Sequence, residues 1–152
     1  MPDQPLGFEI EVDGLSMYTG ALQRLAEFAQ DLSEPFREIS KDFQRVEGER
    51  FNRQGPGWAP LAPATLLRKR GPSILVETGA LKESLMGGAG FIEVITDSQL
   101  IAGTDIPYAR YHQRGTRRMP VREVIKPDAT ATTGWLKIIQ RHLVERAREA
   151  GF

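Results

Sequence analysis

The chain contains no cysteine and only two histidines among its 152 residues. The absence of cysteine excludes disulfides, thiolate metal sites and cysteine nucleophiles. Net charge is also absent, because 20 Lys and Arg residues balance 20 Asp and Glu residues. A neutral chain has no overall electrostatic attraction for nucleic acid or for an anionic membrane. Any such attraction must therefore come from a local group of charges.

Long apolar runs are missing as well. No run approaches the roughly 20 residues that a membrane-spanning helix needs, and the N-terminal segment MPDQPLGFEIEVDG has no signal-peptide pattern. We therefore expect no membrane partner and assembly in the cytoplasm. With 40% apolar and 26% charged residues, the length fits a single domain over residues 1–152 with one hydrophobic core.

Hydrophobic periodicity predicts one strand and then helices in the N-terminal third of the chain. Residues 8–12 alternate apolar and acidic side chains, which is the period of a half-buried strand. Over residues 15–32 the apolar positions recur at steps of three and four, with Ser16 as a candidate cap. A second helical pattern covers residues 36–46. The two patterns fit either one kinked rod or an αα-hairpin.

The remaining two thirds of the chain alternate short elements with flexible loops rich in glycine and proline. In chain order we expect a loop at 52–63, short helices at 64–70 and 80–85 (capped by Thr78), a loop at 86–90, a hairpin of 91–96 and 100–104, a helical turn at 107–113, a strand at 121–125 and an amphipathic helix capped by Thr133. This order predicts an α+β fold, in which a small antiparallel sheet packs with N-terminal helices and a C-terminal amphipathic helix.

The two histidines are the natural candidates for acid–base chemistry. His142 lies on the predicted C-terminal helix with no ligand-like neighbour, which is typical of a solvated helix residue. For His112 the nearest acid in sequence is Asp105, seven positions away, and no nucleophile is connected to either. We interpret His112, together with Tyr108, as bracing a turn. The chain also lacks metal-ligand spacings and phosphate-binding loops, so we expect no catalytic residue, metal or cofactor.

The densest charge feature is a group of arginines that no acidic residue interrupts. Its members are Arg110, Arg114, Arg117, Arg118 and Arg122. Two tyrosines are interleaved with them, so contact with a nucleic-acid backbone is one interpretation. Zero net charge makes a protein interface the favoured interpretation, and a solvated loop is the third.

Residues of two other kinds are candidates for the same interface. Trp58, in a glycine- and proline-rich loop, either plugs the local core or anchors a contact. The acidic residues Glu9, Glu11 and Asp13 near the N-terminus offer a surface on a neighbouring subunit with which the arginines could pair.

Four short motifs follow one another within about residues 36–126. They are Gly57-Trp58-Ala59-Pro60-Leu61, then Leu75 to Ser84 with Thr78-Gly79-Ala80-Leu81, then Gly103-Thr104 with Pro107-Tyr108-Ala109, and His112-Gln113-Arg114-Gly115. Each motif is weak alone, but their order and spacing resemble the phage virion morphogenesis family, the Mu-like tail-completion proteins. After the last motif the family commonly has a tract with Arg-Pro, which is altered here to Arg117-Arg118-Met119-Pro120.

The resemblance implies a non-catalytic structural protein of a tailed-phage virion, which completes the tail or joins head and tail at the neck. It suggests a homo-oligomeric ring, with six as the copy number, that binds neck or connector and tail-tube proteins while DNA passes nearby without being read. Assembly would take place in the host cytoplasm. The alternatives are a tail terminator that caps the tail tube, a small nuclease that depends on His112, and a nucleic-acid-binding module.

Overall fold

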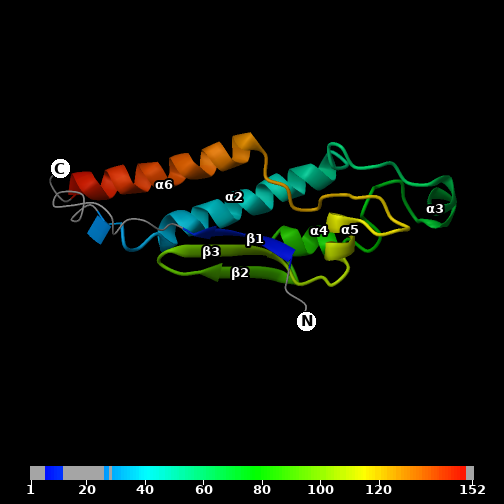
Figure 1. The fold of residues 1–152 in the computed structure, drawn as a ribbon, viewed down its shortest axis with the longest axis horizontal. Coiled ribbons are helices and arrows are strands. Elements are labelled where there is room, and N and C mark those ends of the chain that lie inside the picture. Colours follow the sequence, from blue (N-terminus) through cyan, green and yellow to red (C-terminus); the bar gives the residue numbers. More distant parts are fainter. Residues whose placement is uncertain (1–5, 12–25, 28, 150–152) are drawn as a thin grey trace. The chain divides into compact units, whose positions relative to one another are not determined.

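The computed structural model of the chain describes residues 6–11, 26–27 and 29–149. Its elements (Figure 1) are β1 (Leu6–Glu11), α2 (Ser33–Asn52), α3 (Pro63–Arg68), α4 (Ala80–Leu85), β2 (Phe91–Ile95), β3 (Gln99–Thr104), α5 (Ala109–Arg114) and α6 (Ala129–Glu149). These helices and a small antiparallel sheet confirm the α+β prediction. The predicted cap Ser16, and residues 15–25 of the predicted first helix, lie outside the described residues.

The chain divides into two compact units, each made of three separate segments. Unit 1 comprises Met1–Phe8, Gln44–Ile92 and Ala102–Lys126. Unit 2 comprises Glu9–Phe43, Glu93–Ile101 and Pro127–Phe152. The single domain over residues 1–152 stays a prediction.

The three strands form one sheet in the order β1-β3-β2, so β3 is the central strand. The predicted hairpin of β2 and β3 is confirmed, and its turn is closed by the Thr96 hydroxyl, which accepts hydrogen bonds from the backbone N–H groups of Ser98 and Gln99. In unit 1 the β1 and β3 backbones come very close. A Cβ added at Gly103 would lie 2.2 Å from the carbonyl oxygen of Leu6, so glycine is required there.

Unit 2 contains α6 and the first part of α2, which lie side by side (Figure 1). The Trp135 side chain is buried and its Nε1 donates a hydrogen bond to Asp42 at 2.8 Å. An exposed ion pair between Arg141 and Glu38 adds a second link. The apolar stripe that predicted an amphipathic C-terminal helix faces this contact, because Ile139 is buried together with Trp135. The predicted helix is therefore confirmed.

The start of α6 lies before the predicted cap. Asp128 caps the helix, because its Oδ1 accepts a hydrogen bond from the backbone N–H of Ala131 at 2.7 Å. Thr133 lies inside the helix, so the prediction that it caps the helix was wrong. An aspartate competes better for this position because its carboxylate is a stronger acceptor beside the positive end of the helix dipole.

The first predicted helix does not extend to Leu32. Residues 26–27 are helical, whereas residues 29–32 form a turn and an irregular segment, so the C-terminal end of that prediction was wrong. The backbone N–H of Leu32 donates to the carbonyl of Asp97 at 2.8 Å instead of continuing a helix. Asp31 then accepts a hydrogen bond from the backbone N–H of Ser33, where α2 begins.

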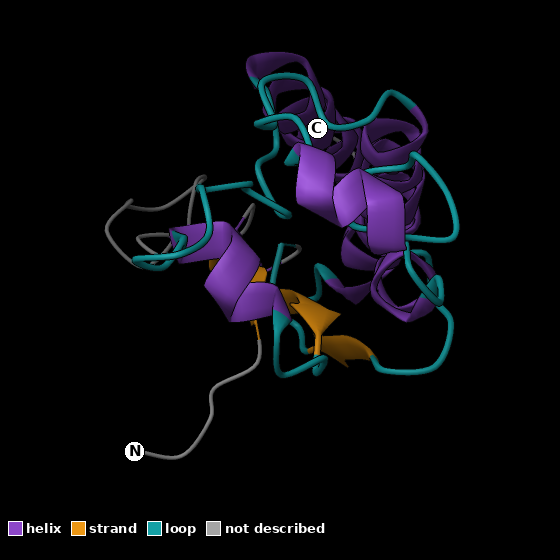
Figure 2. Ribbon diagram, turned by 90° about the vertical axis from the view of Figure 1, so that its right-hand side faces the viewer, coloured by secondary structure: helices purple, strands orange, loops and turns teal. Residues whose placement is uncertain are grey.

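Unit 1 consists largely of loops between short helices, drawn in teal in Figure 2. Residues 53–62 and 86–90 are loops as predicted, and their flexibility stays a prediction. Gly55 has a φ of 57°, and a Cβ there would lie 1.7 Å from the Trp58 ring. This glycine is therefore required both by the backbone and by the packed indole.

Helix α4 begins at Ala80, and Gly79, which has a φ of 87°, is its N-cap residue. The prediction that Thr78 occupies the cap position was therefore wrong by one residue. The Thr78 hydroxyl still contributes, because it accepts a hydrogen bond from the backbone N–H of Ala80 at 3.3 Å. Within unit 1, α4 is joined to β3 by a buried hydrogen bond of 2.7 Å between the hydroxyls of Ser84 and Thr104.

Candidate functional site

A tight turn at Thr116–Met119 presents two arginines from unit 1, and we call it the arginine turn. Its ends are paired through the backbone, with Thr116 N donating to Met119 O at 2.9 Å and Met119 N donating to Thr116 O at 3.3 Å. The Thr116 hydroxyl also accepts from the N–H groups of Arg118 and Met119. Arg117 and Arg118 occupy the two central positions and are exposed. Their backbone is thus fixed while their side chains point to solvent.

The five arginines predicted to share a surface have different environments. Arg114, Arg117 and Arg118 are exposed. Arg110 is half-buried; its guanidinium carbon lies 5.0 Å from the centre of the Tyr111 ring, and Nη2 donates to the Tyr111 hydroxyl. Arg122 is only 8% exposed. It is therefore the three exposed arginines that remain available for a partner.

Arg122 holds a loop in place from inside unit 1. Its Nε donates to the carbonyl of Ala59 at 2.8 Å and its Nη2 donates to the carbonyl of Pro60 at 3.0 Å. Burial disfavours the charged form and lowers the pKa of the Arg122 guanidinium. The backbone N–H of Arg122 in turn donates to the carbonyl of His112 at 2.8 Å. Arg122 thus links two parts of unit 1: its guanidinium binds the 59–60 loop, and its backbone N–H binds α5.

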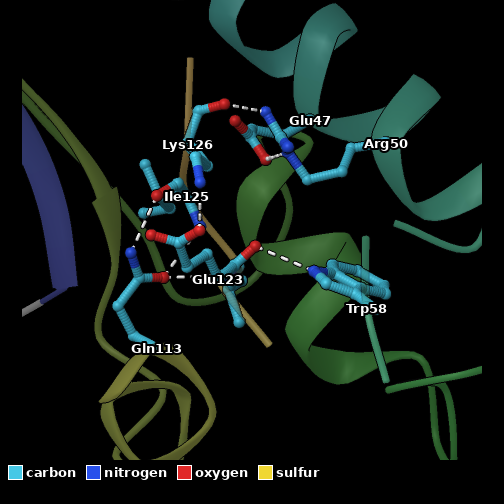
Figure 3. A network of polar contacts seen from close by, with 8 residues as sticks. Glu47, Arg50, Trp58, Gln113, Glu123, Ile125 and Lys126 are labelled. Atoms are coloured by element: carbon cyan, nitrogen blue, oxygen red, sulfur yellow. Dashed lines mark hydrogen bonds and ion pairs between the residues drawn. The ribbon is translucent and has the colours of Figure 1, made fainter. Parts of the chain in front are cut away.

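Residues 121–126 form an irregular segment between α5 and α6 that we call the strap, and the prediction of a strand over residues 121–125 was wrong. Among the described residues the strap has no neighbouring strand to receive its backbone hydrogen bonds. The Gln113 amide takes that place (Figure 3): Oε1 accepts from the N–H groups of Val124 and Ile125 at 2.7 and 3.0 Å, and Nε2 donates to the Ile125 carbonyl at 2.8 Å. One side chain therefore satisfies three backbone groups.

Trp58 connects the strap to the core of unit 1. Its Nε1 donates to the carbonyl of Glu123 at 2.9 Å, as Figure 3 shows. Its ring meets Phe51 edge to face, with centroids 5.2 Å apart, and Phe51 is buried. The indole is half-buried. Of the two interpretations considered for Trp58, these contacts favour the plug of the local core.

The C-terminal end of the strap is held by an ion pair from α2. Arg50 donates to the carbonyl of Lys126 and pairs with Glu47 at 2.9 Å (Figure 3). The Glu47 side chain is fully buried, and its Oε1 has no hydrogen-bond partner among the described residues. Burial raises the pKa of Glu47 to about 7, although the charge and hydrogen bond of Arg50 oppose the shift.

This buried carboxyl should make the folded protein less stable as the pH rises. The folded state binds the Glu47 proton more tightly than the unfolded chain, because the pKa rises from 4.5 to about 7 on folding. The contribution of Glu47 to the free energy of unfolding is therefore full below about pH 4.5. It is lost as the pH rises from there through about 7, and the total loss is up to about 3 kcal/mol. Urea unfolding at several pH values between 5 and 8 measures this slope.

Glu47→Gln should flatten the slope because it removes the titrating group while keeping an acceptor for Arg50. Glu49→Gln is the matched control, since Glu49 is an exposed residue on the same helix and its loss should leave the slope unchanged. The same slope in the wild type and in Glu47→Gln would show that another group causes it.

His112 fixes α5 to the strap through its backbone carbonyl, which accepts the hydrogen bond from Arg122. Its ring meets Tyr108 edge to face at a centroid distance of 6.2 Å. Nδ1 is buried without a hydrogen-bond partner among the described residues. Burial first, and then the charge of Arg122, lower the pKa of His112. A neutral imidazole packed on Tyr108 fits the bracing role predicted for both residues, which stays a prediction.

A groove with a volume of about 610 Å³ opens beside the strap. Its lining comes from the 60–69 region, the 75–81 segment and the region from Tyr108 to the strap. The residues are Pro60, Leu61, Ala62, Pro63, Thr65, Lys69, Leu75, Val76, Glu77, Thr78, Gly79, Ala80, Leu81, Tyr108, His112, Arg118, Met119, Pro120 and Arg122. All four motifs singled out in the sequence therefore contribute residues to one groove in unit 1.

Sequence reasoning missed this groove, although its signal was present. Prolines and small residues at 59–64 and 78–80 leave space that larger side chains would fill. Periodicity cannot reveal that two such segments face each other, because neither belongs to a long helix or to a strand.

The predicted acidic partners lie elsewhere in the chain. Glu9 and Glu11 are exposed on β1, and Glu9 accepts a hydrogen bond from the Gln99 side chain. Both belong to unit 2, whereas the arginine turn belongs to unit 1. Asp13 lies outside the described residues.

Two kinds of feature are absent from the part of the chain that the structure describes. No group of three or more His, Cys, Asp or Glu residues there could hold a metal ion. None of the described helices combines the length and the apolar character that crossing a membrane requires.

Comparison with known proteins identifies the family. A search of curated proteins and a search of solved structures gave no match. The model of the phage virion morphogenesis family matches residues 14–149, which is most of the chain and includes segments of both units. Such a protein has a structural or assembly role in the virion of a phage. The chain therefore belongs to the phage virion morphogenesis family.

Proposed function

We propose that this protein completes the phage tail and joins it to the filled head at the neck, without catalysing a reaction. The observation that carries the proposal is the arginine turn, whose backbone is held by hydrogen bonds while Arg117 and Arg118 are exposed, in a chain of a virion assembly family. A fixed loop loses little conformational entropy when it docks, so it suits recognition of an acidic protein surface.

The proposed assembly is a ring of identical copies. A ring needs a heterologous interface, in which one patch meets a different patch on the next copy. The arginine turn and the acidic strand with Glu9 and Glu11, which Asp13 follows in the sequence, supply two unlike patches on one chain. Copies then associate head to tail, and six is the number that the sequence resemblance suggests.

The proposed neighbours are neck or connector proteins above the ring and tail-tube proteins below it. Segments rich in glycine and proline, at 52–63 and at either 71–74 or 86–90, order on docking to them. DNA passes through the lumen without sequence-specific contacts, in agreement with the zero net charge of the chain.

Electron microscopy of particles made without this protein tests the proposed role. We expect DNA-filled heads and separate tails of normal length, because the missing step is joining. Overlong tails would instead identify a tail terminator, whose absence leaves tube polymerisation uncapped. Intact, joined virions in the absence of the protein would contradict both roles.

A further inference from the structure

We propose that the groove of unit 1 is the docking site for an extended segment of a partner protein, with apolar side chains that fill the groove and carboxylates at their flank. The inference deepens the proposed function and rests on it for the kind of partner, a neighbouring virion protein. The groove's volume of about 610 Å³ lies within the range of roughly 300–1,000 Å³ that is usual for binding pockets.

The interior of the groove suits apolar side chains. Leu61, Val76, Leu81 and Met119 line it beside prolines and small residues. An apolar segment that enters this space leaves water and gains the free energy of burial, about 25 cal/mol for each Å² of apolar surface. A polar ligand would gain little from these walls.

Leu75, another lining residue, shows that one wall is held in an unfavourable conformation. Its φ of 58° lies in the left-handed region, which costs a branched residue of this kind free energy. The neighbouring Ile74 N–H is held by the Gln54 side chain, whose Oε1 accepts from it at 2.6 Å. Such strain is retained where the surrounding structure fixes it, and it is frequent at ligand-binding sites.

The charges around the groove indicate which charge the flanks of the partner segment should carry. Arg118 lines the groove and is exposed, and Lys69 lines it with its Nζ donating to the Ser73 carbonyl. Glu77 is the one acid among the lining residues. Exposed Arg114 and Arg117 add positive charge on the same chain segment, which has no acid between positions 106 and 122. Carboxylates complement this rim.

The same charges disfavour α3 of a second copy of the chain as the occupant. Among the described residues of unit 1, the most exposed large apolar residue is Leu67, at 88% exposure on α3, and Leu66 beside it is 49% exposed. These leucines are followed directly by Arg68, Lys69 and Arg70. Placing α3 of another copy in the groove would bring those cations against Arg118, which costs interaction free energy.

Fluorescence anisotropy with three synthetic peptides tests the proposal on the purified full chain. The peptides share one core of leucine and valine, flanked by glutamates, by lysines or by serines. We expect the glutamate-flanked peptide to bind about tenfold more tightly than the serine-flanked one and the lysine-flanked one to bind most weakly.

Variants of the rim and of the interior separate the two parts of the site. Arg118→Glu, at an exposed position, should reverse the preference, so that the lysine-flanked peptide binds more tightly than the glutamate-flanked one. Ala80→Trp and Thr65→Trp should each fill the groove and weaken all three peptides. Lys137→Glu, at an exposed position of unit 2, is the matched charge control and should keep the wild-type order. Circular dichroism confirms that each variant is folded.

Three outcomes would overturn the proposal. They are equal affinity for the three peptides, no binding of any peptide, and a wild-type preference that persists in Arg118→Glu. Sedimentation of the chain alone adds a fourth, because oligomers that dissociate in the Ala80→Trp variant would show that a second copy fills the groove. None of these outcomes affects the test of head–tail joining, which is read from particles.

Discussion

Replacing Gln113 by alanine should lower the free energy of unfolding by about 4 kcal/mol, since each buried polar group that loses its partner costs roughly 1–3 kcal/mol. Gln113 alone serves three backbone groups of Val124 and Ile125, at distances of 2.7 to 3.0 Å. Val124 and Ile125 are buried, so water does not readily replace the amide. Urea unfolding of the two proteins at one pH measures the difference.

Two further variants show whether the hydrogen bonds of the Gln113 amide cause the expected loss of stability. Gln113→Glu keeps both acceptor bonds and loses the donor to the Ile125 carbonyl, so it should cost less than Gln113→Ala. Gln140→Ala removes an exposed glutamine from α6 and should change the unfolding free energy by less than about 0.5 kcal/mol. A Gln113→Ala protein as stable as the wild type would mean that the strap is not held by this side chain.

The elements with strong periodicity could be predicted from the sequence. The hairpin, the α+β class and the amphipathic face of α6 followed from alternating or helical spacing of apolar residues. The capping residues of the helices could not be predicted as well. Asp128 caps α6 and Gly79 caps α4, whereas the sequence suggested Thr133 and Thr78. Several nearby residues can cap a helix, and only the folded backbone selects one of them.

The strap could not be predicted, because its composition is typical of a strand, whereas a side chain and not a neighbouring strand makes its backbone hydrogen bonds. Residues 121–125 are rich in β-branched residues, and a sequence pattern does not show that a glutamine eight residues earlier supplies the hydrogen bonds. The same holds for Arg122. Its charge suggested an exposed contact, whereas two loop carbonyls keep it buried. The groove depends on segments far apart in the sequence and was missed for that reason.

Reversing the charge of both arginines in the arginine turn should stop head–tail joining while leaving the protein folded. Arg117 and Arg118 are exposed, and the turn is held by hydrogen bonds from the backbone and from the Thr116 hydroxyl. Substitution by glutamate therefore removes no bond that maintains the turn. At an interface with an acidic surface, two reversed charges cost several kcal/mol, so we expect infectious particles to fall by about a hundredfold or more.

The most direct measurement of the proposed role of this turn is the fraction of joined virions made with the Arg117→Glu, Arg118→Glu protein. Electron microscopy counts joined and separate heads and tails, and circular dichroism of the purified protein verifies its fold. The Lys41→Glu, Lys137→Glu protein is the control, because it has the same change in net charge at exposed helix positions of unit 2. We predict filled heads and separate tails with the arginine variant, and joined virions with the control. Joined virions at the wild-type frequency with the arginine variant would contradict the account.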